Sequence, residues 1–162
     1  MKFVGKFLVC YTSLMKKGVD YIGVGVGAVV IEKGKVFITL RGKKARNEVG
    51  KWEIPGGGVE FGETLKDAIK REIKEENDFD IEIVELLGVN DHIIKEEKQH
   101  WVSPTFICKI KSGVPKIMES DKCEAIGWFT LDEASKLPLS IVTKYDIELL
   151  KNKYPAGLPD FN

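Results

Sequence analysis

The segment from Thr64 to Asn77 (TLKDAIKREIKEEN) constrains the fold of this chain more than any other. At about 3.6 residues per turn, it predicts an amphipathic helix with one apolar stripe. That stripe consists of Leu65, Ala68, Ile69 and Ile73. Glu72 and Glu76 fall inside the stripe, where an ordinary amphipathic helix carries apolar side chains. The chain must therefore form a helix whose inward face carries carboxylates as well as apolar side chains.

Inward carboxylates need a compensating cation, because burying an unpaired carboxylate costs several kcal/mol. Glu75 lies at the edge of the same stripe. The opposite face carries Lys66, Asp67, Lys70, Lys74 and Asn77. Ion pairs on a solvated surface would explain the lysines of that face, but they leave Glu72 and Glu76 unexplained. Oxygen ligands without His or Cys favour Mg²⁺ or Mn²⁺ over zinc, so the helix predicts a hard divalent metal site.

A glycine-rich loop is expected directly before this helix, from Gly56 to Glu63. The run Gly56-Gly57-Gly58 permits close approach of the backbone to a ligand, so a carbonyl there is a candidate metal ligand. The start of the helix can receive an anion. Taken alone, three glycines also fit a simple tight turn. Together with the acidic helix, they indicate a phosphate-containing substrate.

The rest of the chain predicts a mainly β protein. Strands are expected at 21–31, 36–40, 81–94, 100–110 and 125–129, with a hairpin turn at 32–35, a short extended piece at 52–55, helices at 131–136 and 141–152, and a surface tail at 154–162. A mixed central β-sheet flanked by helices follows, which is an α+β fold of the α-β-α sandwich type in one domain over 1–162. The glycines between Gly23 and Gly27 lack both the GxGxxG spacing and a following helix, which argues against a dinucleotide-binding turn.

Composition narrows the classes of partner. The 162 residues hold 25 basic and 25 acidic side chains, so the net charge of zero argues against a stable nucleic-acid partner. Only Arg41, Arg46 and Arg71 are arginines, so a site that needs the rigid, planar guanidinium group has few candidates.

The cysteines and the N-terminus bear on the compartment. The three cysteines, at 10, 108 and 123, form no CxxC pair and are expected to be small buried residues in a reducing compartment. The apolar run of residues 1–10 is short and contains Lys6, so we expect a cytoplasmic protein without a membrane segment.

One longer pattern unites the glycine loop and the acidic helix. It reads Gly57-x5-Glu63-x7-Arg71-Glu72-Ile73-x-Glu75-Glu76-x-Asp78-Phe79. This resembles the signature of the Nudix hydrolases, G-x5-E-x7-R-E-U-x-E-E-x-G-U, where U is bulky and apolar. Every fixed position matches except the second glycine, which is Asp78 here. We call residues 57–79 the Nudix box.

The resemblance implies hydrolysis of a nucleoside diphosphate linked to another group. It implies that Mg²⁺, or Mn²⁺, is held by the carbonyl of Gly57 and the carboxylates of Glu72, Glu75 and Glu76. Arg71 would orient Glu72 or Glu75 through a bidentate pair, and Glu63 would bind metal through water or hold the loop. The general base is expected to be a glutamate of the box, with Glu124 as the candidate outside it.

Residues 86–129 are similar to the nucleoside triphosphate diphosphatase branch of the family, which includes the enzyme acting on thiopurine nucleotides. The expected reaction therefore converts a nucleoside triphosphate to a monophosphate and diphosphate. Arg41 or Lys43 is expected to touch phosphate, and Trp101 to stack on the base. Core packing is the alternative role for Trp101, Phe106 and Trp128. We expect His92 and His100 to be structural.

Two other functions remain open. ADP-ribose or another nucleotide sugar is the alternative substrate, and a non-catalytic nucleotide-binding regulator is the alternative class. The regulator is disfavoured because such proteins usually lose box carboxylates, which this chain retains. The expected partner is a small nucleotide. By resemblance to relatives that pair through sheet edges or N-terminal strands, a homodimer is also expected.

The departure at Asp78 generates a prediction. The family glycine ends the helix, where a left-handed backbone conformation is common. Asp tolerates this conformation at a cost of about 1 kcal/mol. Asp78→Gly should therefore raise the free energy of unfolding slightly, as measured by chemical denaturation, and leave turnover similar. A large loss of activity in this variant would contradict the assignment of position 78 as a helix end without a ligand role.

Overall fold

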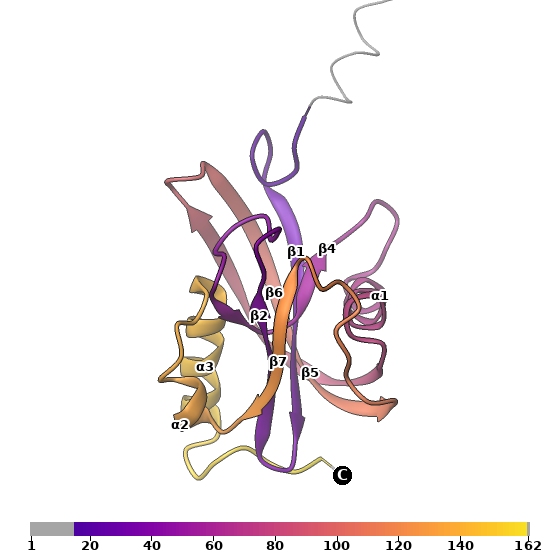
Figure 1. Ribbon diagram of the computed structural model, residues 1–162, viewed down its shortest axis with the longest axis vertical. Coiled ribbons are helices and arrows are strands. Elements are labelled where there is room, and N and C mark those ends of the chain that lie inside the picture. The colour runs from indigo at the N-terminus through magenta and orange to yellow at the C-terminus, as the bar shows by residue number, and fades with distance from the viewer. Residues whose placement is uncertain (1–14, 162) are drawn as a thin grey trace, which may run out of the picture.

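The computed structural model describes residues 15–161, so Cys10 and the N-terminal apolar run lie outside the described residues (Figure 1). Its elements follow the chain as β1 (Gly23–Glu32), β2 (Lys35–Arg41), β3 (Trp52–Glu53), β4 (Gly56–Gly58), α1 (Leu65–Asn77), β5 (Asp80–Ile94), β6 (Gln99–Ser112), β7 (Cys123–Phe129), α2 (Leu131–Ala134) and α3 (Ile141–Lys153). The strand and helix positions predicted from the sequence are confirmed to within a few residues.

The hairpin of β1 and β2 divides the strands into two groups. Its turn places Lys33 and Gly34 at positive φ, of 49° and 73°, as a tight two-residue hairpin requires. The two strands pair only next to this turn, at Ile31↔Val36 and Glu32↔Lys35. Beyond it, β1 pairs with β4 and, in parallel, with β6, whereas β2 pairs with β3 and β7. The separated ends of β1 and β2 leave room between the groups.

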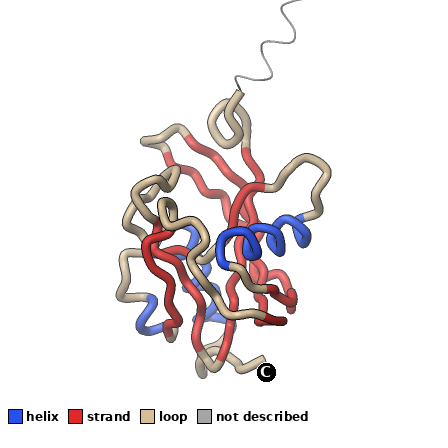
Figure 2. Tube along the Cα trace, turned by 45° about the vertical axis from the view of Figure 1, so that its right-hand side comes forward, coloured by secondary structure: helices blue, strands red, loops and turns tan. Residues whose placement is uncertain are grey.

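Helices cover the strands from two sides. In Figure 1, α1 lies on one side of the strands, and α2 and α3 lie on the other. Figure 2 shows α1 crossing the strands in the turned view. One core cluster joins α1 to β1, β5 and β6 through residues such as Ile69, Ile73 and Phe106. A second joins α3 to the strands through residues such as Ile107 and Leu150. The expected mixed sheet flanked by helices is therefore confirmed.

Three local expectations were wrong. Gly56 to Gly58 form a short strand rather than a loop, and Gly56 lies so close to β1 that an added Cβ would be 2.1 Å from the carbonyl oxygen of Val26. Leu65, in the first turn of α1, is exposed. Asn77 is buried because the segment after β6 crosses the end of the helix, where the Lys116 N–H donates to the Asn77 carbonyl at 2.9 Å.

The ends of α1 are built as the sequence indicates. The hydroxyl of Thr64 accepts from the backbone N–H of Asp67 and caps the first turn. Asp78 ends the helix in the left-handed conformation, at φ 55° and ψ 33°, so the expected role of this position is confirmed. Its carboxylate pairs with Lys74 at 3.0 Å and with Lys116 at 3.2 Å. Glycine would lose these two exposed pairs, which offsets part of the gain expected from Asp78→Gly.

The chain after α3 packs on the second core instead of projecting from it. Tyr154, Leu158 and Phe161 contact that cluster. Among the helices of residues 15–161, none has both the length and the apolar character that a membrane crossing needs.

Buried polar side chains join α3 to both groups of strands. The Thr143 hydroxyl accepts from the Ile54 N–H at 2.9 Å. One turn further on, Asp146 is fully buried and accepts from the Asn90 amide at 3.0 Å and from the Thr105 hydroxyl at 3.1 Å. Burial raises the pKa of Asp146 to about 7, although these two hydrogen bonds oppose the rise. Asp146 is therefore a buried carboxyl with neutral partners.

The raised pKa of Asp146 predicts a pH dependence of stability. Between 3.8 and about 7, the folded protein holds a proton on Asp146 that the unfolded chain has lost. The free energy of unfolding should therefore fall as pH rises through this window, by an amount on the order of 4 kcal/mol. Asp146→Asn should remove the decrease in the free energy of unfolding that deprotonation of Asp146 causes, as measured by chemical denaturation at pH 5 and pH 8. Equal pH dependence in both proteins would contradict it.

Candidate active site

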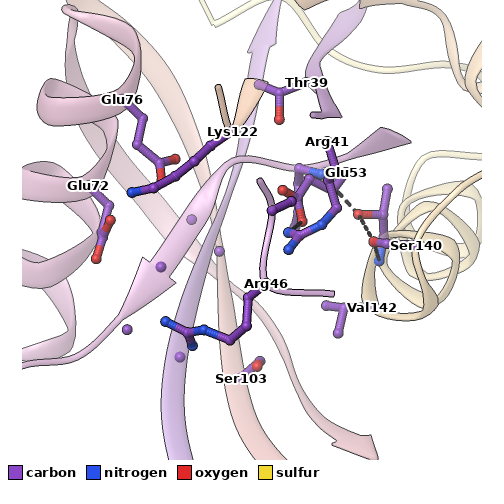
Figure 3. Close-up of a pocket in the computed structure, with 18 of the residues that line it drawn as sticks. Thr39, Arg41, Arg46, Glu53, Glu72, Glu76, Ser103, Lys122, Ser140 and Val142 are labelled. Carbon is purple, nitrogen blue, oxygen red and sulfur yellow. Dashed lines mark hydrogen bonds and ion pairs between the residues drawn. The ribbon is translucent and has the colours of Figure 1, made fainter. Parts of the chain in front are cut away.

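The gap between β1 and β2 holds a cavity of about 500 Å³. Its walls come from β1, β2, the three glycines of β4, the inner face of α1, the strand β6 and the start of α3. Segments far apart in the sequence therefore meet around one space, as Figure 3 shows. The splayed hairpin is what makes this space available.

The acidic wall of the cavity comes from α1. Glu72 and Glu76 both line it, and the Glu72 side chain is 13% exposed. Glu75 is 60% exposed and does not line the cavity. An added Cβ at Gly57 would be 2.1 Å from the carboxyl carbon of Glu72. Only glycine at position 57 therefore lets β4 lie directly against this carboxylate.

Arg71 holds the acidic side chains of the box in place. Its Nε and Nη2 donate to the two carboxylate oxygens of Glu63, at 2.6 and 2.9 Å. Nη2 also donates to the Gly58 carbonyl at 3.1 Å, and Nη1 donates to Glu72 at 3.0 Å and to Glu75 at 3.2 Å. The bidentate pair expected with Glu72 or Glu75 is formed with Glu63 instead, and Glu72 and Glu75 each accept a single hydrogen bond from Nη1. The hydrogen bonds from Arg71 lower the pKa of Glu63 to about 2, so Glu63 is a fixed anion that anchors Arg71.

The acidic wall has more negative charge than its neighbours neutralise. Burial, and then the carboxylates of Glu72, Glu53 and Glu119, raise the pKa of Glu76 to about 8. Burial also raises the pKa of Glu72, against the effect of Arg71. Such a group of oxygen ligands suits a divalent cation, and the close fit of Gly57 to Glu72 brings backbone and carboxylate together. Within residues 15–161, no three His, Cys, Asp or Glu side chains already converge as a metal-binding group.

The sequence-predicted residues outside the box divide into two sets. Arg41 and Trp101 line the cavity. Arg41 donates to Glu53 and to the Asn47 carbonyl and side-chain oxygens, at 2.8 and 2.7 Å, so it is held by the protein itself. Lys43 is exposed and lies outside the cavity lining, to which Lys44 and Arg46 of the same loop contribute.

Glu124 is the predicted candidate for the general base outside the box. It is exposed on β7 and does not line the cavity, because strand residues alternate and Cys123 takes the inward position. Cys123 therefore differs from Cys108, which is buried in the core as expected. Phe106 and Trp128 pack in or against the first core, so their alternative role as core residues is confirmed. His100 lies 3.8 Å from Asp91, and His92 lies 3.2 Å from Glu48 at the cavity edge.

Glu53, Glu119, Lys122 and Arg46 are charged residues of the cavity lining that the sequence did not indicate as site residues. Glu53 lies three residues before the glycine run, in a strand of two residues. Such a strand is too short for an alternating pattern that would show which side chain points inward. Glu119 and Lys122 come from the turn before β7, where Lys122 contacts both carboxylate oxygens of Glu119 at 2.9 Å. The sequence identifies Arg46 only as one of three arginines and gives no sign that it lines a cavity. Loop residues of this kind carry no sequence pattern that places them in a cavity.

The comparisons with known proteins agree with this arrangement. Residues 22–150 match the NUDIX domain. The chain belongs to the Nudix hydrolase family. It is 33% identical to a MutT-like protein of Streptomyces ambofaciens, over 83% of this chain and 79% of that protein. It superimposes on the crystal structure of a MutT Nudix hydrolase from Burkholderia pseudomallei with a TM-score of 0.75 and 37% identity, covering 80% of this chain and 98% of that one.

A further relative is the ADP-ribose pyrophosphatase of Methanocaldococcus jannaschii, which is 32% identical over 67% of this chain and 62% of that protein. The match to this and two other curated relatives spans only 24% to 62% of each relative's own length. Membership of the family makes the chain a Nudix pyrophosphohydrolase.

The close contact of Gly57 with Glu72 generates a matched pair of predictions. Gly57→Ala should displace the Glu72 carboxylate and lower turnover by about 100-fold, because small displacements of a positioned group are costly. Gly58→Ala adds the same methyl group one residue later, where the nearest atoms are 3.9 Å away, and should retain most activity. Turnover and thermal unfolding of both variants are the measurements. Equal losses in the two would contradict the specific role of Gly57.

Proposed function

We propose that this protein hydrolyses nucleoside triphosphates to nucleoside monophosphate and diphosphate. The observation that carries the proposal is the acidic wall of Glu72 and Glu76, facing a cavity that also holds Lys122 and Arg46. A cavity of about 500 Å³ falls in the range of small-molecule sites. Carboxylates that bind a divalent cation, together with basic side chains, suit a polyphosphate.

Glu72, Glu76 and the Gly57 carbonyl are the groups that would hold Mg²⁺. When bound, Mg²⁺ neutralises phosphate charge and lowers the pKa of a coordinated water. Arg71 keeps Glu72 in place through its contact at 3.0 Å and is itself anchored by Glu63. Glu75, which meets Arg71 outside the cavity, stays a predicted ligand.

The chemistry requires one proton acceptor. Oxygen of water attacks a phosphorus of the substrate, the P–O–P anhydride bond breaks, and the water gives up a proton. We assign its acceptance to Glu76, through the carboxylate oxygen that a metal ion would leave free, because Glu72 is engaged by Arg71 and Glu75 is exposed. Glu76 belongs to the box, so this assignment follows the expectation of a box glutamate. The expected homodimer also stays a prediction.

Hydrolysis of ADP-ribose is the second candidate. The similarity to the Methanocaldococcus jannaschii ADP-ribose pyrophosphatase favours it. Both reactions break a P–O–P bond, so the acidic wall serves either. The two differ in what lies beyond the second phosphorus, a phosphate or a ribose.

A hydrolysis panel tests this proposal. With Mg²⁺ present, we expect nucleoside triphosphates to give monophosphate and diphosphate at a higher kcat/KM than ADP-ribose, sugar nucleotides or dinucleoside polyphosphates. Products are separated by ion-exchange chromatography. Faster turnover of ADP-ribose would establish the second candidate instead.

A matched pair of glutamate variants tests the role of the acidic wall. Glu76→Gln should lower kcat by about 100-fold or more, because it removes a carboxylate that faces the reacting phosphates. Glu124→Gln makes the same change on an exposed strand position and should leave turnover unchanged. If Glu76→Gln behaved like wild type, the metal-site argument would be wrong. Mg²⁺ titrations of both variants show whether the loss follows metal affinity.

A further inference from the structure

Arg46 is distinguished from the other two arginines by its unused hydrogen-bond donors. Arg71 contacts three glutamates and a carbonyl, and Arg41 is held by Glu53 and Asn47. Arg46 lines the cavity, and among residues 15–161 no hydrogen bond or ion pair involves its guanidinium. A guanidinium has five N–H donors in a fixed fork. Arg46 can therefore receive a group of the substrate without first breaking a contact within the protein.

Trp101 holds this guanidinium in place. The guanidinium carbon of Arg46 lies 5.2 Å from the centre of the Trp101 ring, within the range of a cation–π contact. The indole is itself fixed, because its N–H donates to Gln99 at 3.2 Å and its ring lies against the backbones of Gly18 and Gly23. An added Cβ at either glycine would come within 2.4 Å of the ring. Arg46 thus rests on a rigid platform, which limits the entropy lost when its donors bind.

Arg46 is not the cation that faces the acidic wall. That place belongs to Lys122, which lines the cavity together with Glu72 and Glu76. Figure 3 shows Lys122 beside Glu76 and the Arg46 side chain on the side of Ser103. If the phosphates bind at the acidic wall, as the proposed function holds, the group near Arg46 and Trp101 is the other end of the nucleotide. That end is the base.

We infer that Arg46, held on Trp101, reads the edge of the nucleobase and selects 6-oxopurines. A guanidinium fork pairs with two adjacent acceptors, which guanine and hypoxanthine present as O6 and N7. Adenine presents N7 beside an amino donor, which the fork repels. The Ser103 hydroxyl, which also lines the cavity, can accept or donate to the same base. This inference rests on the proposed function and adds the identity of the base.

ITP and ATP are the substrates that isolate this contact, because ITP carries the oxygen at position 6 where ATP carries the amino group. We expect wild type to prefer ITP and GTP over ATP by about 5- to 150-fold in kcat/KM, which corresponds to one bidentate pair. Arg46→Ala should bring the ITP/ATP ratio close to one, mainly through KM. Arg46→Lys keeps the charge without the fork and should lose the preference as well. Lys43→Ala, an exposed position of the same loop outside the cavity, should keep it.

Binding to the protein without added metal separates the inference from the proposed function. Calorimetry with GMP, AMP and pyrophosphate should show that Arg46→Ala weakens GMP alone. If Arg46→Ala weakens AMP and pyrophosphate as much as GMP, Arg46 holds phosphate and the inference is overturned. It is also overturned if wild type shows no ITP/ATP or GMP/AMP preference, or if Arg46→Ala leaves that preference unchanged. If wild type hydrolyses no triphosphate, the proposed function fails, and the GMP/AMP comparison alone decides the role of Arg46.

Discussion

The arrangement of the active site depends on the guanidinium of Arg71. One planar group joins the start of α1, the backbone of β4 and the acidic side chains of the helix through hydrogen bonds to Glu63, Gly58 and Glu72. Lys could supply a charge at this position, but its three donors sit on a single nitrogen and do not form the planar fork that spans these partners. Because Glu63 anchors Arg71 as a permanent anion, the helix and the glycine strand are fixed relative to each other. The acidic wall faces the cavity as a consequence.

The glycines of β4 connect the packing of the backbone with the position of a site carboxylate. Glycine at 56 lets β4 approach β1, and glycine at 57 lets it approach the Glu72 carboxylate. A side chain at either position would separate layers that have to touch. Gly56 and Gly57 therefore determine both the packing of β4 and the position of the Glu72 carboxylate, within a short strand.

The fold and the core of the site could be predicted because they depend on local patterns. The helical period of residues 64–77 placed Glu72 and Glu76 inward, and both line the cavity. The lysine-rich loop has no periodic pattern of apolar residues, so the sequence does not show that Arg46 rather than Lys43 lines the cavity. The sequence also does not show that Glu124 lies outside the cavity lining, because the inward face of a short strand depends on how β7 pairs with β2. Asn77 is buried by the segment around Lys116, which is distant in sequence. A helical wheel shows only the residues of the helix itself, so it cannot predict this contact.

The parallel pairing of β1 with β6 has a consequence for how this protein is made. Gly23 lies opposite Trp101, so the centre of the sheet is closed by a strand that leaves the ribosome long after its partner. The Nudix box is complete at residue 79, yet the cavity also needs β6, β7 and the start of α3. Long-range pairing of this kind delays folding until late contacts form. A nascent chain that has just completed the box therefore carries the whole catalytic signature and still has no active site.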